Sequence, residues 1–247
     1  MEKQEVRETV WDALDDHGEA RFPFPPHGRI PNFAGADDAC DRLAGTREWA
    51  AADTLKCNPD APQLPVRRAA LRVGTTLYMA QPRLRDPKPF LRLDPAVVED
   101  IDEATTVSGV SKHGVAVAPE DVPHVDLVVA GSVAVTTDGA RIGKGEGYSD
   151  LEWAMLRELD AVDDATRVAT TVHERQVVDG PSSPIADPAA LPDPDTHDVP
   201  LDLVVTPDRV VRTETPYPRP TGVDWDALDP ERLAEIPVLA DRAPSTE

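Results

Sequence analysis

The chain has 247 residues, 40% of them hydrophobic, and its 46 acidic and 25 basic residues give a formal net charge of −21. This length and apolar content suffice for one large α/β domain with its own core. So negative a surface repels nucleic acids and anionic membranes. Its self-repulsion is a liability unless salt screens it, which predicts a cytoplasm of high ionic strength, such as that of a halophile.

Two cysteines, Cys40 and Cys57, stand in no metal-ligand spacing, so we expect buried or free thiols in a reducing compartment. The N-terminus lacks the apolar segment of a secretion signal, and no apolar run approaches the length of about 18 residues that a membrane helix needs. We therefore expect a cytoplasmic protein, monomeric or homodimeric, that binds neither nucleic acid nor a membrane.

In the first part of the chain, apolar residues at helical spacing predict an amphipathic helix over 3–16, with Lys3 and Arg7 four positions apart. Two solvated cations on a surface helix would give the same pattern. The proline-rich stretch 21–33 contains three phenylalanines and predicts an ordered, extended loop. Arg83 is a candidate site residue, because it follows a predicted strand at the edge where open α/β sheets bind ligands. Other elements expected in this part are helices over 36–43, 47–55 and 66–72 and a strand over 76–79.

The run 125–130 is the most apolar in the chain and indicates a central strand covered on both faces. The segment 179–200 is rich in Pro, Asp and Ser and is typical of a surface excursion, although a lid would have the same composition. We expect one domain over 1–240, a mainly parallel α/β sandwich, and a frayed acidic tail over 241–247. Further expected elements are helices over 95–104, 151–159 and 230–236, and strands over 115–117, 167–172, 201–205 and 209–212.

The stretch 141–150, Arg-Ile-Gly-Lys-Gly-Glu-Gly-Tyr-Ser-Asp, has three glycines at alternate positions before a predicted helix. Glycines permit positive φ, so consecutive N–H groups can line one concavity at a helix N-terminus, where a phosphate binds. Arg141 and Lys144 add full charges, and Asp150 is expected to begin and cap the helix. A hairpin turn with two solvated cations explains the same residues, because the spacing matches neither common phosphate-binding motif.

Several stretches, in this order, resemble the 5-formyltetrahydrofolate cyclo-ligase family, also called methenyltetrahydrofolate synthetase. They are Val125-Asp126-Leu127-Val128-Val129, the loop from Asp138 to Asp150, Gln176-Val177 and Leu201-Asp202-Leu203-Val204-Val205-Thr206. A second set is similar to the methenyltetrahydrofolate synthetase domain-containing branch, in a haloarchaeal-like form. It comprises Phe22-Pro23, Arg29-Ile30-Pro31-Asn32-Phe33, Pro82-Arg83-Leu84, Gly131-Ser132-Val133-Ala134-Val135 and Leu151-Glu152-Trp153-Ala154-Met155.

The resemblance implies a three-layer α/β/α sandwich and a ligase of one-carbon metabolism. Such an enzyme uses ATP and Mg²⁺ to convert a reduced folate, 5-formyltetrahydrofolate, into 5,10-methenyltetrahydrofolate. Implied catalytic residues are Arg141, Lys144 and Tyr148. Implied nucleotide or phosphate contacts are Lys3, Arg7, Gly143, Gly145, Glu146 and Gly147. Implied substrate contacts are Arg83 and Gln176, and the implied metal ligand is Asp150.

The glycine loop departs from the family pattern Gly-x-Gly-Gly-Gly-Tyr-Tyr-Asp-Arg, because Glu146 replaces a glycine, Ser149 a tyrosine and Leu151 the arginine. An added carboxylate and a lost cation weaken the stabilisation of phosphate charge. The family's folate-binding carboxylate has no clear counterpart, because 48–65 diverges, and Glu48 is the candidate. Two alternatives stay open: an ATP-using enzyme on a different pterin or small acid, and a non-catalytic nucleotide-binding or interaction protein of the same fold.

Overall fold

An eight-stranded sheet forms the middle of the computed structural model, which describes residues 1–244. Its strands lie in the order β12 (Val210–Arg212), β11 (Leu203–Val205), β10 (Arg167–Thr171), β7 (Leu127–Val129), β3 (Thr54–Cys57), β4 (Thr76–Ala80), β5 (Phe90–Leu93) and β6 (Val115–Val117). The five strands from β11 to β4 are parallel, and antiparallel pairing is confined to the two edges. The predicted mainly parallel sheet is confirmed, and the run 125–130 supplies its buried central strand β7.

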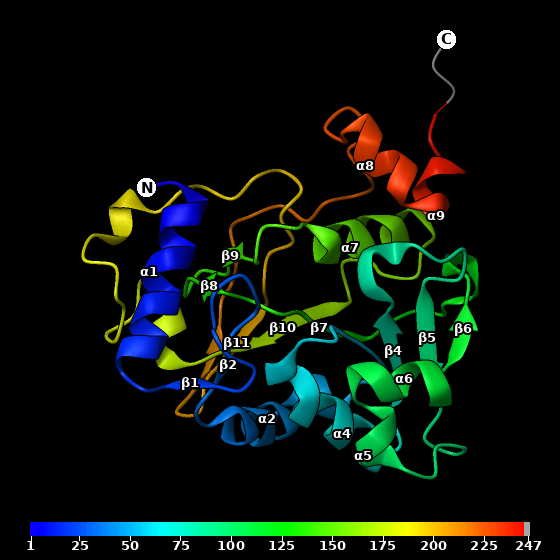
Figure 1. Cartoon of the computed structure of the whole chain (residues 1–247), viewed down its shortest axis with the longest axis horizontal. Helices are drawn as coiled ribbons and strands as arrows, with labels where there is room; N and C mark the ends of the chain where they lie inside the picture. The colour runs from blue at the N-terminus through cyan, green and yellow to red at the C-terminus, as the bar shows by residue number, and fades with distance from the viewer. Residues whose placement is uncertain (245–247) are drawn as a thin grey trace.

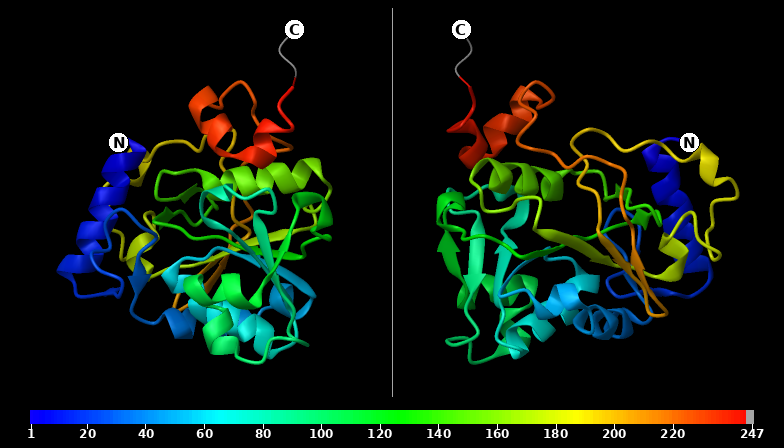
Figure 2. Two further views of the ribbon diagram at one scale, coloured as in Figure 1. Left: turned by 45° about the vertical axis from the view of Figure 1, so that its right-hand side comes forward. Right: turned by 180° about the vertical axis from the view of Figure 1, so that it is seen from behind.

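Helices cover both faces of this sheet (Figure 1), and the rotated views keep the same arrangement (Figure 2). One face carries α2 (Ala36–Ala44), α3 (Arg47–Ala50), α4 (Leu64–Arg72), α5 (Ile101–Ala104) and α6 (Val107–His113). The other face carries α7 (Tyr148–Glu158), α8 (Pro230–Glu235) and α9 (Pro237–Ala240). The fold is therefore the three-layer α/β/α sandwich that the resemblance implies.

Successive side chains of β3 divide between the two faces, because side chains alternate along a strand. Leu55 and Cys57 are buried in the core that α2 and α4 share with the sheet. Lys56 lies between them in sequence and pairs with Glu152 of α7 on the opposite face. Cys57 and Cys40 are both buried free thiols, as predicted.

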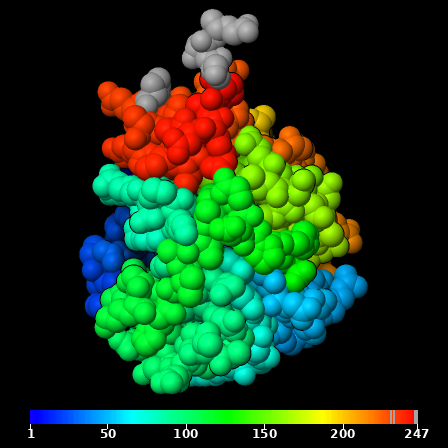
Figure 3. Space-filling model, turned by 90° about the vertical axis from the view of Figure 1, so that its right-hand side faces the viewer, coloured from blue at the N-terminus to red at the C-terminus, as the bar shows by residue number. Residues whose placement is uncertain are grey.

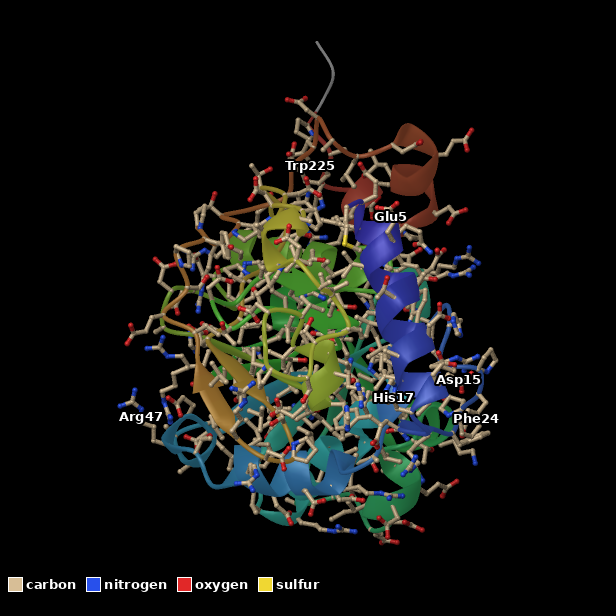
Figure 4. All side chains as sticks on the ribbon, turned by 90° about the vertical axis from the view of Figure 1, so that its left-hand side faces the viewer. Glu5, Asp15, His17, Phe24, Arg47 and Trp225 are labelled. Atoms are coloured by element: carbon tan, nitrogen blue, oxygen red, sulfur yellow. The ribbon has the colours of Figure 1, made fainter. Side chains whose placement is uncertain are left out.

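The first helix, α1 (Lys3–Asp16), lies beside a two-stranded ribbon made of β8 (Ala134–Val135) and β9 (Arg141–Ile142) (Figure 1). Its apolar face, including Val10, is buried against that ribbon, as the helical spacing predicts. Its other face carries Glu5 and is turned outward (Figure 4). The helix therefore stands at one end of the molecule, next to the glycine-rich loop that follows β9.

The proline-rich stretch is an ordered loop, as predicted, and a ribbon of β1 (Ala20–Arg21) and β2 (Asn32–Phe33) closes it. Phe33 is buried, whereas Phe22 and Phe24 are 78% and 58% exposed. Figure 4 shows Phe24 at the edge of the molecule. One aromatic ring thus anchors the loop while two others remain accessible.

The C-terminal helices, in red, form the upper part of the face that the space-filling view shows (Figure 3). Within the predicted frayed tail, Arg242 forms an ion pair with Glu120. Residues 245–247 of that tail lie outside the described residues. In the described part of the chain, no helix is long and apolar enough to cross a bilayer.

Three sequence predictions of elements are wrong. Residues 47–55 are not one helix, because the short helix α3 is followed by the central strand β3. The helix over 95–104 is a single turn, α5, and neither β5 nor α6 is predicted. The helix after the glycine loop begins at Tyr148 rather than at Asp150. Pairing of β3 between β4 and β7 overrides its weak local pattern, in which a lysine occupies the middle of a buried strand.

Candidate functional site

A cleft of about 570 Å³ opens at the carboxyl edge of the sheet. The chain runs from β3 to β4 on one side and from β7 to β10 and β11 on the other, so the strand order reverses between β3 and β7. Loops leaving neighbouring strands diverge at such a switch point and form a ligand crevice. Three of these loops line the cleft: Asn58-Pro59-Asp60 after β3, Gln81-Pro82-Arg83 after β4, and Gly131 after β7.

The glycine-rich loop, residues 143–147, forms another wall of the cleft. Gly145 and Gly147 have φ values of 103° and 65°, a region in which a larger side chain is strained. Gly147 is the N-cap of α7, and Tyr148 in the first turn lines the cleft. The first N–H groups and the positive end of the helix dipole therefore border the cleft, which favours an anion there.

Arg141 does not extend into solvent, as a phosphate-binding cation in an open loop would. Its side chain is buried, forms an ion pair with Asp150, and donates to the carbonyl of Gly131 at 3.1 Å. Burial by itself would lower the pKa of Arg141, but the Asp150 carboxylate outweighs burial and raises it. Asp150 lies inside the first turn of α7 and also accepts from the Val199 N–H at 3.1 Å. The predicted cap is therefore wrong, and the Arg141–Asp150 pair fastens β9 to α7.

Lys144, Glu146 and Tyr148, three of the predicted site residues, all line the cleft. The Lys144 Nζ lies 2.8 Å from a carboxylate oxygen of Glu146. Glu146, which replaces a glycine of the family pattern, therefore partly neutralises the positive charge of Lys144. Gly143 also lines the cleft.

Arg7 reaches the loop from α1 but from its outer side. Its Nε donates to the carbonyl of Gly143 at 2.7 Å. The guanidinium is also packed against Gly145, where an added Cβ would lie 3.4 Å from Cζ. Arg7 therefore supports the backbone of the loop and does not itself line the cleft.

Lys3 is bound by the segment 179–200, which passes beside α1 in yellow in Figure 1. Its Nζ donates to Asp195 at 2.7 Å and to Asp198 at 2.5 Å. Burial alone would lower the pKa of Lys3, but these two carboxylates raise it. Lys3 does not line the cleft, and its ammonium group is bound by these two carboxylates.

Arg83 lines the cleft from the 3₁₀ turn Pro82–Leu84, as predicted. Arg83 and Leu84 have φ values of 61° and 52°, and each such conformation costs about 1–3 kcal/mol unless packing enforces it. Leu84 is fully buried and provides that packing. The structure does not bring Gln176 into the cleft, because its buried amide donates to the carbonyl of Ser132 at 2.9 Å.

Asp60 is the cleft residue that the sequence analysis missed. Its Oδ2 lies 2.7 Å from the position that a Cβ on Gly131 would take, so only glycine leaves room for it. Burial raises the pKa of Asp60. Glu48, the candidate from sequence, instead pairs with Arg212 on β12 at 3.1 Å and does not line the cleft. The sequence signal for Asp60 is its position in Asn58-Pro59-Asp60, directly after β3, at the edge of the sheet where ligands bind. That signal can be read only once residues 54–57 are assigned as a strand.

A buried ion pair joins two walls of the cleft. Lys56 on β3 pairs with Glu152 on α7, and their side chains are 2% and 6% exposed. The Lys56 Nζ also donates to the side chain of Asn58 at 3.1 Å. Since Asn58 and Glu152 both line the cleft, this pair fixes the spacing between strand and helix.

The sequence profile of the 5-formyltetrahydrofolate cyclo-ligase family matches residues 1–207. The methenyltetrahydrofolate synthase domain-containing protein of Mus musculus is 42% identical over 242 residues, which are 97% of this chain and 62% of that protein. Its counterpart in Homo sapiens is 38% identical over 242 residues, or 97% and 61%. The chain thus spans about three fifths of the length of these curated relatives.

The NMR structure of Aquifex aeolicus 5,10-methenyltetrahydrofolate synthetase is similar in fold, with a TM-score of 0.51 and 18% identity. The match covers 88% of this chain and 96% of that one. At this identity the similarity shows the fold alone.

Proposed function

The chain belongs to the 5-formyltetrahydrofolate cyclo-ligase family, and from this premise we propose that it converts 5-formyltetrahydrofolate into 5,10-methenyltetrahydrofolate with ATP as co-substrate. The observation that carries this proposal is the position of the glycine loop. Its N–H groups and Lys144 border the same cleft as the partly buried carboxylate of Asp60. A phosphate and a polar ring can therefore be held side by side at the switch point of the sheet.

ATP supplies the phosphoryl group that turns the formyl oxygen into a leaving group, after which attack by the second folate nitrogen closes the ring and expels phosphate. Such a reaction needs positioning and charge stabilisation rather than a protein nucleophile. In our proposal the loop N–H groups and Lys144 hold the transferred phosphate. Asp60 accepts hydrogen bonds from the folate ring and orients it. Arg141 and Asp150 keep the loop in shape.

Magnesium does not fit Asp150 as a protein ligand. The carboxylate is neutralised by Arg141, and the same oxygen accepts the N–H of Val199. Magnesium is often held largely by water and substrate phosphates, which is compatible with this arrangement.

The test is the absorbance of methenyltetrahydrofolate during incubation of the purified protein with 5-formyltetrahydrofolate, ATP and magnesium. Molar potassium chloride is used because the net charge of −21 needs screening. We expect a rise that requires ATP, that is lost in Lys144→Ala, and that is retained in Lys112→Ala. Lys112 is a matched control, since it is also paired with a glutamate but lies on α6 and does not line the cleft. No rise from folded protein that binds ATP would reject the proposal.

The second candidate is an ATP-using ligase that acts on a different pterin or small acid. It is favoured by Glu146, whose carboxylate stands at the phosphate end of the cleft and binds Lys144. Binding of ATP without binding of 5-formyltetrahydrofolate would support this candidate. Tight binding of the folate would count against it.

A further inference from the structure

Two arginines line the cleft without a protein partner. Arg29 comes from the proline-rich loop and Arg83 from the turn after β4. Within residues 1–244, neither side chain takes part in an ion pair or a hydrogen bond, and the Nε of Arg29 is buried without an acceptor. The Arg83 side chain is exposed, whereas the Arg29 Nε is buried and lacks the acceptor that such a group usually has; a ligand in the cleft would supply one.

The other cations that line the cleft each have at least one protein partner, although the Nε of Arg141, like that of Arg29, is buried without an acceptor. Arg67 donates to the carbonyl groups of Asn58 and Asp60, at 2.7 and 2.9 Å. Arg141 and Lys144 have carboxylate partners. Within residues 1–244 of a chain with 46 acidic residues, Arg29 and Arg83 differ from these three in having neither a carboxylate nor a carbonyl partner for the side chain.

The two arginines flank the position of Asp60. Ile30, next to Arg29, lies against Gly131 after β7, where an added Cβ would be 3.0 Å from its Cγ1. Arg83 follows β4, and β3, which leads to Asp60, lies between β7 and β4. The loops that carry the two arginines therefore reach the cleft on either side of the loop that carries Asp60.

The backbone holds Arg83 firmly in this place. Leu84 is buried beside it, and both residues have positive φ. Gln81 closes the loop, because its backbone N–H donates to the carbonyl of Pro89 at 2.7 Å and its side-chain Nε2 donates to the backbone carbonyl of Lys88 at 2.9 Å. A strained conformation that packing enforces is typical of a ligand-binding position.

We propose that Arg29 and Arg83 bind the carboxylates of the glutamate tail of a reduced folate, so that the site selects substrates with a carboxylated tail. This inference rests on the proposed function. Guanidinium groups match carboxylates in a two-pronged geometry. The phosphate end of the cleft already has its own donors in the glycine loop, so the arginines are available for a second anionic group. A cleft of about 570 Å³ has the volume of sites that enclose ligands of this size.

The experiment uses Arg29→Gln, Arg83→Gln and the control Lys88→Gln in the full chain. Lys88 is an exposed cation in the same loop as Arg83, and it does not line the cleft. Binding of p-aminobenzoyl-triglutamate, which represents the tail alone, is measured by calorimetry. Turnover is measured with 5-formyltetrahydrofolate and with the analogue that lacks glutamate. We expect each arginine variant to lose about tenfold in tail binding and in kcat/KM for the glutamate-bearing substrate, with unchanged kcat/KM for the analogue. The control is expected to behave as the wild type.

Equal loss on both substrates would overturn the proposal, because the arginines would then not recognise the tail. Weaker ATP binding in the variants would overturn it too, since the ligand would be a phosphate. If no folate is turned over, the proposed function fails. Binding of p-aminobenzoyl-triglutamate then still tests whether Arg29 and Arg83 form an anion site. Binding that depends on Arg29 and Arg83 supports the anion site, and no binding to the wild type rejects it.

Discussion

Lys56 on β3 and Glu152 on α7 form an ion pair inside the protein, beneath the cleft. Both charges have been removed from water, so each depends on the other for compensation. The pair links the central strand to the helix whose N-terminus follows the glycine loop. The Lys56–Glu152 pair therefore contributes both to the stability of the fold and to the shape of the cleft.

We expect Lys56→Met to lower the free energy of unfolding by about 3–5 kcal/mol, because it leaves the Glu152 carboxylate buried without a partner. Denaturant titration measures this loss. The double variant Lys56→Met with Glu152→Leu is expected to recover most of it, since no lone charge remains. Wild-type stability in the single variant would contradict the structural role of the pair.

Asp60→Asn is expected to stabilise the protein while it impairs the reaction. Burial raises the folded-state pKa of Asp60 above its ordinary value of 3.8. The folded state therefore loses stability as the pH rises from 3.8, the pKa in the unfolded chain, through the higher pKa of the folded state. We expect a higher Tm for the variant at about pH 7, and equal Tm values once the pH falls below 3.8. We expect kcat/KM to fall about 10- to 100-fold with the lost folate contact. The exposed Asp16→Asn serves as control, and a lower Tm for Asp60→Asn at neutral pH would contradict the argument.

Lys144→Ala and Glu146→Gln are expected to act in opposite directions on the ATP-dependent rate. Removing Lys144 takes a cation from the phosphate end of the cleft, and kcat is expected to fall about 100-fold. Glu146→Gln releases Lys144 from its partner, and the rate is expected to rise about threefold. Steady-state kinetics at saturating folate measures both. A fall in both variants would show that the Lys144–Glu146 pair itself is needed.

Lys3→Met is expected to loosen the segment 179–200 by removing its hydrogen bonds to Asp195 and Asp198. Because the ion pair is only partly buried, its loss is expected to speed amide exchange in residues 190–199 about two- to fivefold. Hydrogen exchange with mass spectrometry measures the change. Exchange in α4, which lies on the opposite face of the sheet, provides the internal control. Unchanged exchange in the segment would mean that Lys3 does not hold it.

Neither thiol is expected to react with a disulfide reagent at about pH 8 in the folded protein. Burial raises the pKa of Cys40 to about 12 and that of Cys57 to about 11, so almost no thiolate is present. Both thiols should react after denaturation. Rapid labelling of the native protein would show that one of them is accessible.

The sequence by itself determined the features that depend on local order. The apolar spacing of α1 and the uninterrupted run that became β7 reflect neighbouring residues, and both appear in the structure as predicted. Of the three alternate glycines in 143–147, Gly145 and Gly147 have positive φ. The order of motifs along the chain likewise indicated the family. Helix period and backbone freedom act over a few residues, which is why they can be recognised without a fold.

Only the tertiary structure decided which side chains meet in the cleft. β3 acquires its identity by pairing with β4 and β7, which begin about twenty and seventy residues later, so Asp60 at its end could not be recognised locally. The same folding turned Arg141 inward to Asp150 and brought Arg29 and Arg83 to one cleft from distant loops. Contacts between distant segments depend on sheet order and burial, and neither is encoded in the spacing of neighbouring residues.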